Sequence, residues 1–397
     1  MTSLQLGGYD PLDAQLDDAA MAPLRPAARG SRLRLAGWSA SSVPVASLLL
    51  VGIALGPRGI SLLSPGALSL IDPALPVALA VLGVLVGLSL DLRWREDWRP
   101  LGAAFVESAF TAALVGTPLV LFAPAILAAT SLPLPVLAIA LGLCAASSLA
   151  VPAGSAMEPR TPQRVRGFDA VLAIVAGGAL IGTIPAGLTV TAVSLVGQAA
   201  LIAGLLAASA WLLLARTAMA TEQRVFAIAT MLLVGGVADY LSLSALLSGL
   251  VAGMFWQLAG GQARESLRRD ALYIQHSLLV LVLVVAGART EFSLASSALA
   301  AVYVLLRTAG KMLGGSVAGR IAGAVEPRLF GLHVLSPGVF GVALALDAVH
   351  AAGPDLDLLL TLVVLGTIGS ELVAGLGRPH EVVPSDAGPF DAVEGAR

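Results

Sequence analysis

Three charged side chains lie within long apolar runs, where ionised groups are costly and usually serve a function. Lys311 is the only lysine in a chain that has 22 arginines, and it lies in the apolar run 294–319. Arg307 lies one helical turn before it, and Glu107 lies in another apolar run, 100–129. We expect Lys311 to balance charge or couple ion movements, and Glu107 to pair with Arg307 or Lys311 or to carry a proton. A snorkelling or structural role is the alternative for both basic residues.

Composition indicates a membrane protein, because 57% of the residues are hydrophobic, 12% are charged and the mean hydropathy is +0.90. A helix needs about 20 apolar residues to cross the hydrocarbon layer. Twelve stretches fit this requirement: 35–55, 74–90, 100–129, 133–153, 167–187, 193–215, 224–238, 243–260, 272–288, 294–319, 330–351 and 356–377. The predicted fold class is an all-α polytopic membrane protein with about 12 transmembrane helices.

Basic residues predict the orientation, because short cytoplasmic loops carry the excess of Lys and Arg. With a cytoplasmic N-terminus, 19 arginines fall in inner segments and only Arg58 and Arg289 fall in outer loops. We therefore expect a protein of the plasma or inner membrane with both termini in the cytoplasm. Residues 1–34 have no apolar segment typical of a signal peptide and predict a disordered tail, and residues 378–397 predict a second short tail.

A weak internal repeat divides the membrane region. The segments 87–91 and 287–291 both close an apolar span, at an offset of 200 residues. Glycines of the first and eighth spans also match, at an offset of 197 residues: Gly52 and Gly56 with Gly249 and Gly253. A shift of seven spans reverses the direction through the membrane, so the repeats would be inverted. We predict one transmembrane domain, 35–377, composed of repeat one at about 35–190, linker helices at about 193–238 and repeat two at about 243–377.

Inverted-repeat transporters place their binding site where corresponding spans are interrupted by Gly or Pro. Two spans qualify, and their breaking residues are Pro152 and Gly154 in the fourth span and Ser336, Pro337 and Gly338 in the eleventh. Breaks would free backbone carbonyls for cations and expose helix ends whose partial charge must be balanced. An ordinary proline kink or helix end is the alternative for each span.

These segments resemble the membrane domain of the cation/proton antiporter (sodium/hydrogen exchanger) superfamily. Leu50–Pro57 resembles the family's L-x-G-I-x-L-G-P signature, and Leu82–Asp91 resembles a second segment that closes on an acidic residue. Ala238–Ser244 and Arg307–Lys311 are similar to later segments. The resemblance implies discontinuous crossing helices and a core of the fourth, fifth, tenth, eleventh and twelfth spans that moves against the rest. A helix that usually precedes the signature in the family has no apolar counterpart here.

Within this resemblance, Phe168–Asp169 and the apolar run after it match the family's ion site, which implies Asp169 as the transport carboxylate. A carboxylate in a partly dehydrated cavity holds protons strongly, so a proton and a small cation can compete for it. Ser147, Ser148 or nearby carbonyls would complete the site. Phe168 stands where many relatives have a polar residue, which favours electroneutral exchange or another substrate. Because Arg166 lies three residues before Asp169, a salt bridge or helix N-cap is a rival role.

The sequence therefore predicts a secondary active transporter that exchanges Na⁺ or K⁺ for protons in the lipid bilayer, without a cofactor, resident metal or nucleic-acid partner. An enzyme is not expected, because the outer loops are short and nearly uncharged. Proton-coupled export of a small organic ion and a non-transporting antiporter-like sensor or scaffold are the alternatives, and homodimer formation stays open. The remaining polar residues near span ends are interpreted as satisfied structural groups: His276, His333, Asp347, His350 and Glu371.

Overall fold

The computed structural model describes residues 45–90, 98–122, 134–148, 160–186, 190–217, 219–324, 326–335, 338–353 and 356–377. The regular elements within these ranges are all helical: α2 (Val45–Leu55), α3 (Pro65–Ile71), the 3-10 helix η2 (Asp72–Ala74), α4 (Leu75–Ser89), α5 (Trp98–Phe122), α6 (Leu134–Ala146), α7 (Arg160–Ala186), α8 (Val190–Arg216), α9 (Ala220–Tyr240), α10 (Ala245–Ala259), α11 (Gly261–Ala288), α12 (Leu294–Ala322), α13 (Pro327–Val334), α14 (Val339–Ala352) and α15 (Asp357–Gly377). Both predicted tails lie outside the described residues.

Each of the twelve predicted spans overlaps a described helix or a pair of helices, so the all-α polytopic fold class is confirmed. Five segments of the described ranges are long and apolar enough by themselves to cross a membrane: Pro65–Ser89, Trp98–Pro118, Arg164–Gly182, Val196–Arg216 and Arg264–Ala288. Shorter apolar helices accompany them at Val45–Leu55, Val136–Ala146, Ala245–Ala259 and Val339–Ala352. Two of the short helices belong to the spans whose Gly and Pro residues predict a break.

Helix ends differ from the predicted span ends where polar residues continue a helix beyond its apolar run. Helix α7 begins at Arg160 and α11 begins at Gly261, in both cases several residues before the apolar run. Hydropathy measures the apolar length of a span and does not mark where a helix ends. Helix α3 was not predicted as an element, although Ser64 caps it by accepting a hydrogen bond from the N–H of Ala67.

The eleventh span is broken in two, as its Gly and Pro residues predict. Helix α13 ends at Val334, and α14 begins at Val339 directly after Gly338. In the fourth span, α6 already ends at Ala146. Each helix end frees backbone groups that need other partners. The other predicted break residues lie outside the described residues: Pro152, Gly154, Ser336 and Pro337.

Close glycine contacts join the two halves of the chain in a reciprocal pattern. Gly52 of α2 packs on α11, where an added Cβ would lie 2.3 Å from the carbonyl oxygen of Val284. Gly249 of α10 packs on α4, where an added Cβ would lie 1.9 Å from the carbonyl oxygen of Ala80. The glycines one turn later make the same contacts: Gly56 and Gly253. The first helix of each half thus packs on the second helix of the other, as inverted repeats require. The repeat bounds stay a prediction.

We expect Gly249→Ala to destabilise the protein by roughly 1–3 kcal/mol, because the added methyl group must push α4 and α10 apart. The matched control is Gly236→Ala on the exposed side of α9, where a Cβ would meet nothing within 4 Å. Helix propensity alone acts there and favours alanine. Thermal unfolding of the purified protein in detergent measures both variants. Equal melting temperatures would contradict the close approach of α4 and α10.

Candidate functional site

Three ionisable side chains meet in the interior of the helical bundle. Glu107 of α5, Asp169 of α7 and Lys311 of α12 each have 0% exposure. The Nζ atom of Lys311 lies 2.9 Å from Oε1 of Glu107 and 3.6 Å from Oδ2 of Asp169. The lysine therefore bridges two carboxylates and makes its tighter ion pair with Glu107. Pairing with Lys311 is one of the two ion pairs expected for Glu107 from the sequence, and pairing with Arg307 is the other.

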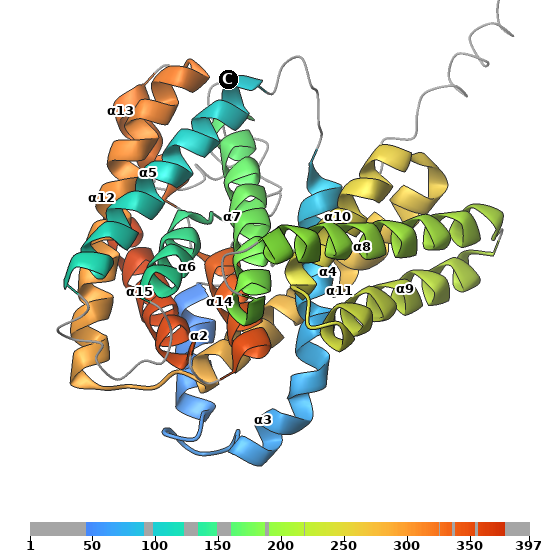
Figure 1. Ribbon diagram of the computed structural model, residues 1–397, viewed down its shortest axis with the longest axis horizontal. Helices are drawn as coiled ribbons and strands as arrows, with labels where there is room; N and C mark the ends of the chain where they lie inside the picture. Colours follow the sequence, from blue (N-terminus) through green and yellow to red (C-terminus); the bar gives the residue numbers. More distant parts are fainter. Residues whose placement is uncertain are drawn as a thin grey trace, which may run out of the picture. The chain divides into compact units, whose positions relative to one another are not determined.

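Glycines on α12 bring Lys311 within reach of Glu107. Helix α12 packs along α5 (Figure 1), and an added Cβ at Gly310 would lie 3.0 Å from Cα of Thr111. One turn later, an added Cβ at Gly314 would lie 3.2 Å from the carbonyl oxygen of Glu107. Small residues at such positions allow two membrane helices to approach closely. The short distance between lysine and glutamate therefore depends on these two glycines.

Hydroxyl groups also surround the two carboxylates. Ser108 donates a hydrogen bond to Oδ1 of Asp169 at 3.1 Å, and Ser148 donates to Oδ2 at 3.3 Å. Thr111 donates to Oε1 of Glu107 at 3.1 Å. Each buried carboxylate thus has neutral donors in addition to its share of one positive charge, which reduces the cost of burial.

The C-terminal end of α6 lies against the same cluster. Because α6 ends at Ala146, its last carbonyl groups have no donor within the helix. Lys311 donates to the carbonyl oxygen of Ala146 and, at 2.9 Å, to the hydroxyl oxygen of Ser148. The Nε atom of Arg307 donates to the carbonyl oxygen of Ala145 at 3.1 Å. Two positive side chains therefore face the partially negative end of α6.

Arg307 lies between the end of α6, the start of α14 and α15. Its Nη1 atom donates to the hydroxyl oxygen of Ser370 in α15 at 2.6 Å. An added Cβ at Gly338, directly before α14, would lie 3.1 Å from Nη2 of the same guanidinium group. At Gly341, an added Cβ would lie 2.4 Å from the carbonyl oxygen of Cys144 in α6. The start of α14 and the end of α6 therefore pack closely, and Arg307 links both to α15.

The two serines that follow α6 have different partners. Ser148 donates to Asp169, whereas the hydroxyl of Ser147 donates to the carbonyl oxygen of Cys144 at 2.8 Å. The carbonyl oxygen of Ser147 accepts from Nη2 of Arg307 at 3.5 Å. Of the two serines predicted to bind a cation, Ser148 is therefore the one whose hydroxyl contacts the carboxylate of Asp169.

The sequence pattern does not single out Ser108 or Thr111, although both contact the cluster. A signal for them was present, because they follow Glu107 by one and four residues in a helix. Residues four apart lie on the same side of a helix, which brings Thr111 to Glu107. Asp169 lies in the interior of α7, which begins at Arg160, so the alternative role as a helix N-cap is wrong. Its neighbour Phe168 is buried beside it, with 7% exposure.

Comparison with known proteins gives one line of support. No protein-family model and no curated protein sequence matches the chain. Among solved structures, the chain is similar to the sodium proton antiporter MjNhaP1 from Methanocaldococcus jannaschii, with a TM-score of 0.58 and 16% sequence identity. The match covers 85% of this chain and 93% of the antiporter chain. The chain therefore has the fold of a sodium/proton antiporter, as its sequence motifs predict.

Proposed function

We propose that the protein is a secondary active transporter that exchanges a monovalent cation, Na⁺ or K⁺, for protons by alternating access. The observation that supports this function best is the burial of Glu107 and Asp169 around a single lysine, Lys311. Within the part of the chain that the structure describes, the two carboxylates share an ion pair with Lys311, so we infer that one negative charge remains for a proton or a cation. The cluster also adjoins two interrupted spans, which is where inverted-repeat transporters bind substrate.

Competition for Asp169 would provide the exchange. An ionised carboxylate away from water is unstable unless a proton or a cation neutralises it. A bound cation would use the carboxylate oxygens of Asp169 and the hydroxyl oxygens of Ser108 and Ser148, because monovalent cations shed water for oxygen ligands. When the cation leaves, a proton takes its place. If only the neutralised site crosses between the two faces, one proton moves for each cation.

Glu107 and Lys311 would stay charged throughout this cycle. Lys311 lies closer to Glu107 than to Asp169, by 2.9 Å against 3.6 Å. It also donates to Ser148, so it orients that hydroxyl group toward Asp169. The pair would therefore position the site, while Asp169 exchanges its ligand. Arg307 would hold the end of α6 in place through Ala145 and join it to α15 through Ser370.

Alternating access would move a core of α6, α7 and α12 to α15, together with α5, which carries Glu107 and Ser108, against the remaining helices. The reciprocal glycine contacts between α2 and α11 and between α4 and α10 favour this division, because they tie four of the remaining helices into close pairs. With both termini in the cytoplasm, the protein would act in the cell membrane, as a monomer or a homodimer.

The test is a vesicle assay with purified protein. The acidic interior of proton-loaded vesicles quenches the fluorescence of a pH-sensitive dye. When Na⁺, K⁺ or Li⁺ is added outside, an antiporter exports protons and the fluorescence returns. We expect dequenching with at least one of these cations, and no response in protein-free vesicles.

A lack of response to every cation at all pH values between about 6 and 9 would overturn this function. Export of a small organic ion would then show as dequenching by an organic cation or anion in the same vesicles. A protein that responds to neither class would favour the non-transporting sensor or scaffold.

We expect Ser108→Ala to weaken cation binding, because the variant loses a hydroxyl oxygen beside Oδ1 of Asp169. A hydrogen bond or ligand of this kind is worth about 1 kcal/mol, so the apparent KM for the cation should rise by about fivefold. The control is Ser316→Ala on α12, whose hydroxyl donates to the carbonyl oxygen of Met312 in its own helix. Concentration series in the dye assay measure both. An unchanged KM in Ser108→Ala would remove this serine from the site.

A further inference from the structure

A carboxylate from α15 holds the beginning of α2. The backbone N–H groups of Val45 and Ala46 donate to Glu371, at 3.0 Å to Oε1 and at 2.5 Å to Oε2. Amide groups in the first turn of a helix lack helical acceptors and carry partial positive charge. A carboxylate is therefore a strong partner for them. The contact joins residues 325 and 326 positions apart in the chain, so it is not a local helix cap.

A second carboxylate, from α14, holds the beginning of α10. Asp347 accepts from the hydroxyl of Ser244 at 2.5 Å and from the backbone N–H of Ala245 at 3.2 Å. One turn further along α14, Nε2 of His350 lies 2.7 Å from Oδ1 of Asp239 near the end of α9. Two side chains of α14 thus bind the end of α9 and the beginning of α10.

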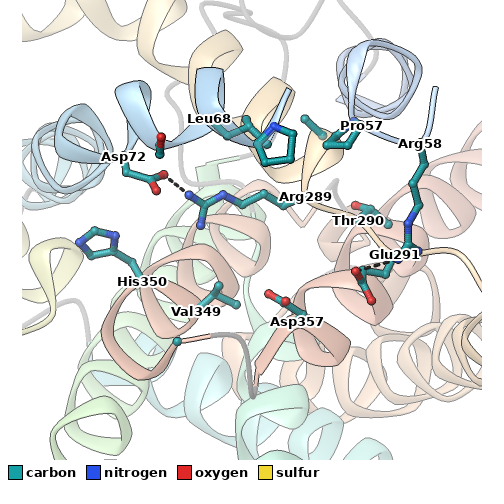
Figure 2. A pocket seen from close by; sticks show the side chains of 14 residues that line it. Pro57, Arg58, Leu68, Asp72, Arg289, Thr290, Glu291, Val349, His350 and Asp357 are labelled. Carbon is teal, nitrogen blue, oxygen red and sulfur yellow. Dashed lines mark hydrogen bonds and ion pairs between the residues drawn. The ribbon is translucent and has the colours of Figure 1, made fainter. Parts of the chain in front are cut away.

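The two carboxylates lie at different depths of the bundle. A pocket of about 650 Å³ lies at one end (Figure 2), and its lining includes Arg58 just after α2, Arg289 just after α11, His350 of α14 and Asp357 at the start of α15. Because His350 contacts Asp239, the start of α10 is at this end too. Val45 lies 13 residues before Arg58, and Glu371 lies 14 residues after Asp357, so the contact at the start of α2 is on the side of the bundle away from the pocket.

Helices α2 and α10 are the first helices of the two proposed repeats, matched through Gly52 and Gly249. The amide groups that bind a carboxylate lie within two helical turns before the glycine of the same helix: Val45 before Gly52, and Ala245 before Gly249. Each carboxylate comes from the proposed moving core, and each held helix belongs to the part proposed to stay fixed. The two contacts therefore hold the beginnings of two corresponding helices, one near the pocket and one on the side away from it.

Both contacts are linked to the buried cluster. Glu371 follows Ser370, whose hydroxyl accepts from Arg307, and Arg307 holds the end of α6. Asp347 lies on the helix whose Gly341 packs against the same end of α6. A movement of the core that exposes Asp169 to one face would therefore strain the contact on that face.

The pocket lies along the boundary that such a movement would open. Figure 2 shows Arg289, paired with Asp72, between the wall that holds Leu68 and the wall that holds His350 and Val349. The first wall belongs to the part proposed to stay fixed, and the second belongs to α14 of the core. Space at this boundary gives α14 room to move once Asp347 releases α10.

We propose that Glu371 and Asp347 are two latches that close the opposite faces of the transporter, and that each face opens only when its own latch releases. This inference rests on the proposed antiport function. It adds two residues that control the movement of the core against the remaining helices and do not contact the substrate. In the structure both latches are closed while Asp169 is fully buried, which corresponds to a site closed to both faces.

Cross-linking each latch tests the proposal. Cys144 is the only cysteine of the chain, so a Cys144→Ala background is free of thiols. One variant then carries Ser244→Cys with Asp347→Cys, and another carries Ala46→Cys with Glu371→Cys. A short bifunctional thiol reagent fixes each pair, and a reductant releases it. Because a fixed latch keeps one face closed, we expect cross-linking to reduce exchange at least tenfold and reduction to restore it.

The controls separate this proposal from the proposed function. Variants with only one of the two cysteines are the first control. Treatment with the same reagent should leave the exchange rate of each single variant equal to its own rate without the reagent. Exchange in the reduced double variant with no change after complete cross-linking would overturn the latches and leave the antiport function intact. No exchange in the wild-type protein would instead contradict the function itself.

A second measurement does not require transport activity. In the native background, a membrane-impermeant maleimide added from one side reports how often water reaches Cys144, which lies one turn before Ser148 and is 2% exposed. We expect Asp347→Asn to raise the labelling rate about fivefold, and only when the reagent is added on the side where α10 begins. Glu371→Gln should raise it from the opposite side only. Unchanged labelling from both sides in both variants would overturn the proposal.

Discussion

Asp169→Asn is expected to abolish cation-dependent proton movement, with a decrease of at least about 100-fold. The asparagine keeps the size of the side chain and can still accept from Ser108, but it can neither hold a negative charge nor bind a proton. A buried charge interaction worth about 3 kcal/mol corresponds to a factor of this size in binding. The dye assay in proton-loaded vesicles measures the loss at matched protein levels.

The control for this variant is Asp270→Asn, which removes a carboxylate that pairs with Arg224 and Arg269 away from the cluster. We expect its exchange rate to equal that of the wild type. Asp169→Glu adds a second comparison, since it retains the charge but displaces it, and should keep a measurable fraction of activity. Exchange at the wild-type rate in Asp169→Asn would exclude this carboxylate as the shared site.

Lys311→Met is expected to cause a large loss of stability. It leaves Glu107 and Asp169 buried without their shared positive charge, and breaking a buried ion pair in this way costs about 3–5 kcal/mol. The carbonyl oxygen of Ala146 and the hydroxyl of Ser148 lose their donor at the same time. A lower melting temperature in detergent and the loss of exchange in vesicles would both report this change.

Combining Lys311→Met with Glu107→Gln separates charge balance from a direct role of the lysine. The double variant has one carboxylate, Asp169, and no paired cation, so its net charge equals that of the wild-type cluster. We expect it to be more stable than Lys311→Met and to recover part of the exchange. Glu107→Gln alone pairs Lys311 with Asp169 and should weaken cation binding.

The comparison for these variants is the exposed ion pair between Arg58 and Glu291, at 2.8 Å. Exposed pairs contribute between 0 and about 1 kcal/mol, so Arg58→Met should change the melting temperature little. If the double variant were as unstable and inactive as Lys311→Met, the lysine would act through its contacts with Ala146 and Ser148, and charge balance would not explain its presence.

The sequence predicts the helices well, because apolar length and the Gly and Pro interruptions are local properties of the chain. The break between α13 and α14 and the positions of the twelve spans follow from such patterns. The sequence is less informative about helix ends, as α7 and α11 show, because polar residues outside the hydrocarbon layer can continue a helix.

For the candidate site, a buried charge in an apolar run is visible in the sequence, but its partner is not. Lys311 and Glu107 stand out by type, whereas Ser108 is one serine among many. Asp347 and Glu371 are interpreted from the sequence as satisfied polar residues, and both do make hydrogen bonds in the structure. Their partners are amides and a hydroxyl at the beginnings of distant helices, which no local pattern predicts.

The fold class, the spans and the buried charges Lys311 and Glu107 can be predicted from the chain alone, since the cost of placing polar groups in lipid acts on each segment separately. The packing of the helices, in contrast, is needed to show that Lys311 binds Glu107 more closely than Asp169, and that Arg307 faces the end of α6. These choices depend on how closely α12 approaches α5 at Gly310 and Gly314. Such an approach is a property of two helices packed together, so it cannot be determined from either segment alone.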